Sequence, residues 1–227
     1  MITKLRWYEA RLDVGRLRAA ARVTAECPYS ETQGWGFQLR ERRSDEFLAT
    51  YVERTERVER TEDPLGRIAE FPVVEYRSVV FRMGLKYPGV ELTNPPRSLG
   101  DLFTHLSEQM NSTINLSDVQ VSVSAWLQSL ERRTNCKVTA MRLGGIALSA
   151  DVSASIHVAG ASDVRMATER LVARRRHEIV GATVIWGTSD AEATAELRGP
   201  GRATLTAPPT QEAVGILRST LQDAAHE

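Results

Sequence analysis

The chain has 227 residues, of which 42% are hydrophobic and 26% charged, a composition typical of ordinary globular proteins. Its 29 basic residues balance 29 acidic residues and neither half is basic, which argues against a strong nonspecific nucleic-acid binder. No run of about 18 apolar residues occurs, and the amino terminus lacks the apolar stretch of a signal peptide. We therefore expect a cytoplasmic protein without a membrane span.

The first forty residues predict short strands. Residues 5–12 mix aromatic and apolar side chains in alternation, which favours a strand. Residues 17–24 fit either a second strand or a helix, since the three alanines at their centre also suit a helix. Residues 33–39 predict a glycine-punctuated strand in which Trp35 and Phe37 share one face.

A short internal repeat follows. Between residues 52 and 62 the phrase Val-Glu-Arg-Thr-Glu occurs twice, separated by one arginine. As a helix this region would offer only a thin apolar stripe of Phe47, Tyr51 and Val58, so we favour a long exposed strand or hairpin arm within residues 40–62. Alternating Glu and Arg on such a strand would form cross-strand ion pairs, each worth about a few tenths of a kcal/mol.

Residues 73–83 predict a strand with apolar groups on both faces. Pro88-Gly89 then turns the chain into a short strand at residues 90–93, and Pro95-Pro96 leads into a helix. The helix is indicated by apolar residues at helical spacing, namely Leu99, Leu102, Phe103 and Leu106.

The second half of the chain predicts a similar mixture. Ser117-Asp118 is expected to cap a helix that carries Val119, Val123 and Trp126 on one side. The remaining expected elements are strands at 137–150, 152–158, 179–186 and 193–198, a helical segment at 163–176, and a terminal helix with Val214, Leu217 and Leu221.

Two stretches of the chain nearly repeat one phrase. Residues 88–96 and 200–209 each begin with Pro-Gly, contain Leu-Thr and end in Pro-Pro before an apolar-periodic segment. Either convergence or a tandem duplication explains this, because each turn signal is common alone. The predicted fold is α+β, a mostly antiparallel sheet with helices on one face. A duplicated strand-turn-strand-helix unit would give pseudo-two-fold symmetry, with halves at 1–112 and 113–227.

The carboxy-terminal pattern from Ala193 to Leu221 is similar to a half-repeat of the TATA-binding-protein-like fold. That fold also ends in strand, turn, strand and helix, and it is also duplicated. The similarity implies a topology over about thirty residues per half, and no functional residue of that family has a counterpart here.

Local catalytic and metal motifs are missing from the sequence. It contains no His-x-x-x-His, no Gly-x-Ser-x-Gly and no phosphate-binding glycine loop. Cys27 and Cys136 form no Cys-x-x-Cys pair, so we expect reduced, partly buried thiols and neither a metal nor a cofactor. His105 is expected to be a partly buried helix histidine.

One basic patch is concentrated enough to suggest binding, at Arg174, Arg175, Arg176 and His177. Three arginines could bind phosphate or the carboxylates of a partner. The alternative is a solvated helix end, where cations are favourable against the helix dipole.

The sequence favours a non-catalytic binding or assembly protein that acts through an exposed sheet face or edge. Sheets with free edges invite strand addition by a protein partner or by a second copy of the chain. One alternative is nucleic-acid binding through the duplicated sheet and the arginine patch. Another, less favoured, is an enzyme whose site is assembled from distant residues, for which the candidates are His157, Cys136, Asp151 and Glu178.

Overall fold

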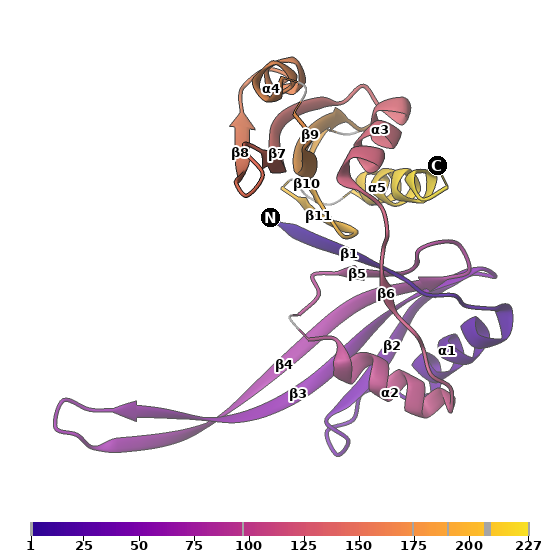
Figure 1. Ribbon diagram of the computed structural model, residues 1–227. Coiled ribbons are helices and arrows are strands. Elements are labelled where there is room, and N and C mark those ends of the chain that lie inside the picture. The colour runs from indigo at the N-terminus through magenta and orange to yellow at the C-terminus, as the bar shows by residue number, and fades with distance from the viewer. Residues whose placement is uncertain (1, 97, 174, 190, 207–209, 227) are drawn as a thin grey trace. The chain divides into compact units, whose positions relative to one another are not determined.

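The computed structural model describes residues 2–96, 98–173, 175–189, 191–206 and 210–226 (Figure 1). These residues divide into two compact units. Residues Ala10–Asn115 form one, the arm unit, while Met1–Glu9 and Leu116–Glu227 form the other, the split unit. Both are mixed α+β, and every pairing between their named strands is antiparallel, which confirms the predicted fold class.

The arm unit has four strands in the order β2-β3-β4-β5, and its two helices contact each other on one face of that sheet. Its elements are α1 (Val14–Glu26), β2 (Trp35–Arg42), β3 (Glu46–Glu62), β4 (Ile68–Gly84), β5 (Gly89–Thr93) and α2 (Gly100–Met110). Residues 17–24, which fit a strand or a helix, belong to α1. The Asp13 side chain caps α1 by accepting a hydrogen bond from the Arg16 amide at 2.8 Å.

The core of the arm unit lies between the helices and one face of β3 and β4. Alternate residues of both strands point into it, because side chains alternate along a strand. The buried residues of these two strands are Phe47, Ala49, Tyr51, Val79, Phe81 and Met83. Burial of this face ends at Tyr51 and Val79, although both strands continue well beyond them.

The split unit is a six-stranded antiparallel sheet in the order β1-β11-β10-β9-β7-β8, with a short additional strand paired to β1. Its strands are β1 (Thr3–Glu9), β6 (Ser117–Asp118), β7 (Lys137–Ala147), β8 (Ser153–Ala159), β9 (Glu178–Gly187), β10 (Glu192–Arg198) and β11 (Arg202–Leu205). Its helices are α3 (Val123–Arg133), α4 (Arg165–Val172) and α5 (Gln211–Ala224). No helix in the described part of the chain is long and apolar enough to cross a membrane.

Buried tryptophans link the helices of the split unit to its sheet. The indole of Trp126 donates to the Leu217 carbonyl at 3.2 Å and to the Thr220 hydroxyl at 3.1 Å, which joins α3 to α5. The Trp7 ring meets the Trp126 ring edge-on, with centroids 5.5 Å apart. Strand β1 therefore belongs to the core of the carboxy-terminal half.

Two predicted boundaries in the second half are wrong. Ser117-Asp118 does not cap a helix but pairs with β1, opposite Glu9 and Tyr8. The cap of α3 is Ser122, which accepts a hydrogen bond from the Ala125 amide at 3.1 Å. The helical segment expected at 163–176 is shorter, because Ala173 adopts a left-handed conformation that ends α4 at Val172.

The repeated phrase marks similar local paths in the two units. Strand β4, a turn, β5 and α2 follow one another in the arm unit, as β10, a turn, β11 and α5 do in the split unit. Both turns require glycine, because a Cβ at Gly89 would lie 2.2 Å from the Ala10 oxygen and one at Gly201 would lie 2.9 Å from a Val119 carbon. Pro208 and Pro209 lie outside the described residues, and the duplication and its symmetry stay a prediction.

Candidate functional site

The most distinctive surface of the molecule is the distal part of the β3–β4 hairpin, residues 54–78, called the arm (Figure 1). Strand β2 pairs with β3 only as far as Glu53, and β5 pairs with β4 only as far as Val80. Beyond these points β3 and β4 pair only with each other, in unbroken register out to Glu62 and Ile68. The predicted hairpin arm is therefore confirmed as a long two-stranded ribbon.

A well-formed turn closes the arm. The Asp63 carboxylate accepts hydrogen bonds from the amides of Leu65 at 2.8 Å and Arg67 at 2.9 Å. Gly66 has φ of +78°, which glycine adopts without a steric penalty. At the other end, the rings of Tyr76 and Tyr29 meet edge-on with centroids 6.1 Å apart. Both ends of the ribbon are thus held by specific contacts.

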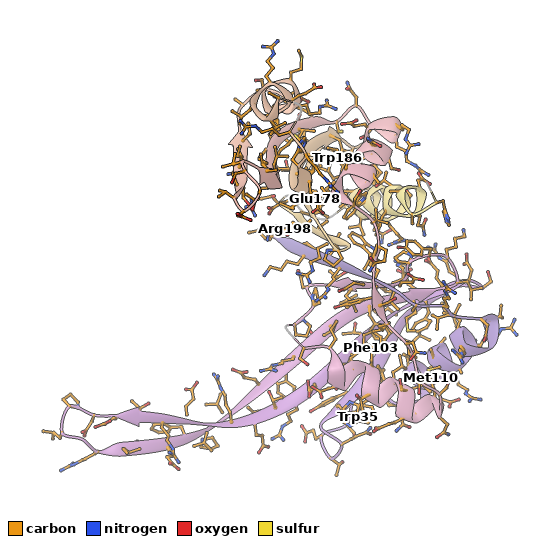
Figure 2. All side chains as sticks on the ribbon, in the orientation of Figure 1. Trp35, Phe103, Met110, Glu178, Trp186 and Arg198 are labelled. Carbon is orange, nitrogen blue, oxygen red and sulfur yellow. The ribbon has the colours of Figure 1, made fainter. Side chains whose placement is uncertain are left out.

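The arm exposes large apolar side chains. Figure 2 shows side chains projecting from both faces of the ribbon, whereas Trp35, at the base, lies beside α2. The exposed fractions are 60% for Val58, 78% for Leu65, 65% for Ile68, 54% for Phe71, 43% for Val74 and 59% for Tyr76. Isolated two-stranded ribbons are marginally stable in water, so a ribbon with this apolar content gains stability from any surface that covers it.

The charges of the arm are largely paired within it. Arg57 contacts Glu59 at 2.7 Å and Glu75 at 2.8 Å, and Arg60 contacts Glu70 at 2.7 Å. Arg54 and Glu56 form another pair. Most of these side chains are solvent-exposed, so such pairs contribute little to stability, about 1 kcal/mol or less each. Positive and negative side chains therefore alternate along the ribbon and contact one another.

The two edges of the arm differ. The Arg54 amide donates to the Gly34 carbonyl at 2.7 Å, so the backbone groups of Arg54 face away from β4. Because these directions alternate along a strand, those of Glu56, Val58 and Arg60 also face outward, where no described strand pairs with them. Strand β3 therefore offers a complete edge of donors and acceptors.

The outer edge of β4 is interrupted by Pro72. This proline lies opposite Val58, whose backbone groups point away from β4, so the missing N–H costs no hydrogen bond between β3 and β4. The donor is missing from the outer edge of β4 instead. Proline on an exposed edge discourages strand addition, which leaves β3 as the edge that can accept another strand.

A second cluster, at the base of the arm, is structural. The rings of Trp35 and His105 stack with centroids 3.9 Å apart, and the Tyr51 hydroxyl lies 2.9 Å from Nδ1 of His105. Burial, then the charges of Glu53 and Asp101, raise the pKa of Tyr51 above its usual value. His105 is half-buried on α2, as predicted.

Three of the four residues of the predicted basic patch are described, and they lie on the surface of the split unit. Arg174 lies outside the described residues. Arg175, Arg176 and His177 are exposed in the loop after α4, and none forms an ion pair with another described residue. The Arg175 carbonyl lies 2.8 Å from Nδ1 of His177. The described residues of the patch therefore lie in the loop that follows the carboxy-terminal end of α4.

The four candidates for a dispersed active site all lie in the split unit. Cys136 is buried, and burial raises the pKa of its thiol. His157 lines a shallow pocket with Arg142 and Glu196, but Cys136, Asp151 and Glu178 do not line it. Among the described residues, no three His, Cys, Asp or Glu side chains are grouped as a metal ion would need.

A basic row that the sequence analysis missed crosses the face of the split-unit sheet opposite the buried Trp186 and Leu197. Strand registers place five basic residues in line, with Gly181 between the second and third. In strand order they are His157, Arg142, Arg198, Arg202 and Arg6. Glu196 contacts Arg142 at 3.5 Å and Arg198 at 2.8 Å, and the Arg6 guanidinium lies 4.5 Å from the centre of the Tyr8 ring.

Comparison with known proteins adds no family. No protein-family model matches the chain, and no curated protein is significantly similar to it.

Proposed function

We propose that the protein is a non-catalytic assembly protein that associates through its β3–β4 arm. The observation that supports this most strongly is the complete outer edge of β3 beside exposed apolar side chains on the same ribbon. Strand addition at such an edge supplies backbone hydrogen bonds, and coverage of the apolar side chains adds hydrophobic free energy. The mixed, internally paired charges of the arm suit a protein surface better than a polyanion.

An armless variant tests the proposal. Residues 56–74 are replaced by Asn-Gly, so that Thr55 and Glu75 flank a two-residue turn of the type that short hairpins favour. Every buried residue of the base and the Tyr29–Tyr76 contact are retained, so the melting temperature should stay close to that of the wild type.

Sedimentation velocity then separates the outcomes. The wild type should sediment as an oligomer, and the folded armless variant as a monomer. A wild type that stays monomeric at high concentration, without a co-purifying protein, would contradict the proposal. An armless variant that keeps the wild-type oligomer would also contradict it, because another surface would then be responsible.

The basic row supports a second candidate function, single-stranded nucleic-acid binding on the split-unit sheet. Adjacent strands are about 4.8 Å apart, so the row spans a length that several backbone phosphates could follow. The observation in its favour is that four arginines and a histidine share one line across six strands.

Fluorescence anisotropy with a labelled single strand at low salt tests this candidate. Replacement of both Arg198 and Arg202 by Ala should weaken binding and lower the slope of log K against log salt by about 0.7 per lost phosphate contact. The same double change at Arg175 and Arg176 is the matched control. No binding at micromolar protein would exclude the candidate.

A further inference from the structure

The edge of β3 has a charge pattern that is complementary to itself. Residues 54–62 read Arg-Thr-Glu-Arg-Val-Glu-Arg-Thr-Glu, with Val58 at the centre. If this segment is laid antiparallel against its own copy with Val58 opposite Val58, every arginine faces a glutamate and every threonine a threonine. The resulting pairs are Arg57 with Glu59, Glu56 with Arg60, Thr55 with Thr61 and Arg54 with Glu62.

We propose that a second copy of the chain pairs with the outer edge of β3 in this register, about a two-fold axis at Val58. This inference rests on the proposed assembly function and names its partner and its geometry. The ribbon that results has four strands in the order β4-β3-β3-β4, two from each copy.

The backbone directions limit the possible registers, and this register is among those they allow. Only the even-numbered residues of β3 direct their N–H and C=O groups to the free edge, so even residues must face even residues of the copy. Val58 opposite Val58 then forms a hydrogen-bonded pair, flanked by two Glu56–Arg60 pairs, for about six backbone hydrogen bonds. The pairing ends near Arg54, whose amide already bonds Gly34.

The neighbouring registers place like charges together. With the axis at Arg57, that residue faces its own copy and Arg54 faces Arg60. With the axis at Glu59, that residue faces its own copy and Glu56 faces Glu62. Like charges directly opposite each other destabilise a strand pair, so both shifts are disfavoured. An unrelated partner strand would have no reason to match this symmetry, which is why we assign the site to a second copy.

The same register also extends the apolar surface. Val58 and Pro72 are directly opposite within one arm, so the two copies place Pro72, Val58, Val58 and Pro72 in one row. Val74 and Tyr76 lie on this same face of β4, because their partners Glu56 and Arg54 share the even-numbered face of β3. Four strands that share an apolar row come closer than a lone hairpin to a stable sheet, which needs three or more strands with a hydrophobic face.

A charge-swap experiment tests the register. Glu56→Arg places two arginines opposite each other at both flanking positions, and Arg60→Glu places two glutamates there. Each single variant should self-associate about tenfold or more weakly than the wild type. An equimolar mixture of the two restores opposite charges at every position and should associate within about threefold of the wild type.

The controls are Arg67→Glu and Glu31→Arg, which make the same charge changes at exposed positions outside the paired segment. Both should leave association unchanged in sedimentation velocity. Circular dichroism and thermal unfolding check that all variants fold.

The outcomes separate this inference from the broader proposal. If the wild type dimerises but the single variants dimerise equally well, the register is wrong while assembly through another surface stands. If the single variants dissociate and their mixture does not recover, the antiparallel pairing about Val58 is wrong. If the wild type is a monomer at every concentration, both this inference and the assembly function fail.

Discussion

The β3–β4 hairpin has two regions built from the same two strands. At its base, one face is filled by Phe47, Tyr51 and Phe81 beneath two helices. In the arm, the same face carries mainly polar and charged residues, among them Arg57, Glu59 and Glu75. The register does not change between the two regions, so the backbone is common to both. The side chains alone decide where the ribbon has a core and where it is left for a partner.

Truncation of an aromatic residue should show the largest contrast between these regions. Phe81 is fully buried against the rings of Phe37 and Phe47, and Phe81→Ala should lower the free energy of unfolding by about 3–5 kcal/mol. Phe71 in the arm is 54% exposed, and Phe71→Ala should change it by about 0.5 kcal/mol or less. Urea unfolding measures both. Equal losses would mean that the arm is part of the folding core.

Removing an ion pair should also destabilise the base more than the arm, but by a smaller amount than removing an aromatic ring. At the base, Arg82 contacts Glu46 at 2.7 Å, and both side chains are about four-fifths buried. Arg82→Ala leaves Glu46 without this partner in a partly desolvated site and should cost about 1–3 kcal/mol. Arg57→Ala in the exposed arm should cost about 0.5 kcal/mol or less. If Arg57→Ala lowers the free energy of unfolding as much as Arg82→Ala does, the ion pairs of the arm are not screened by solvent.

The Tyr51–His105 hydrogen bond should have an effect of about 1 kcal/mol and a dependence on pH. Folding raises the pKa of Tyr51 above its usual value of 10.0, so the folded state disfavours the ionised phenol. The associated stability is complete below pH 10 and decreases as the pH rises further. The free energy of unfolding of Tyr51→Phe should therefore decrease less than that of the wild type between pH 9 and about 11. Parallel pH profiles for the two proteins would contradict the buried position of this hydroxyl.

The sequence predicted the arm because its signal is local. The Val-Glu-Arg-Thr-Glu echo has no helical stripe, and turn residues follow it at Asp63 and Gly66. Likewise, the helical spacing around Leu102 and Leu106 correctly indicated α2 and a partly buried His105. Such features depend on residues that are close together along the chain, so they can be recognised in the sequence alone.

Features that depend on strand pairing could not be read in the same way. The basic row joins residues from Arg6 to Arg202, and only the order of six strands brings them into line. The membership of β1 in the split unit depends on contacts such as Trp7 with Trp126, across more than a hundred residues. In contrast, Arg174, Arg175 and Arg176 are adjacent in sequence, so that cluster could be recognised without knowing the fold. The self-complementary pattern about Val58 was visible, but its meaning required knowing which edge of β3 is free.

Cross-linking through Val58 is the sharpest test of the proposed pairing of two copies about that residue. In a Cys27→Ser background, Val58→Cys places two thiols at the proposed two-fold axis, where facing Cα atoms are about 5.5 Å apart, within reach of a disulfide. Val74→Cys is the control, since it lies on the same face of β4, and the β4 strands of two copies would be about 14 Å apart. On mild oxidation, pairing about Val58 should give a disulfide-linked dimer for Val58→Cys and little for Val74→Cys. Equal cross-linking at both positions, or none at Val58 in a protein that sediments as a dimer, would contradict it.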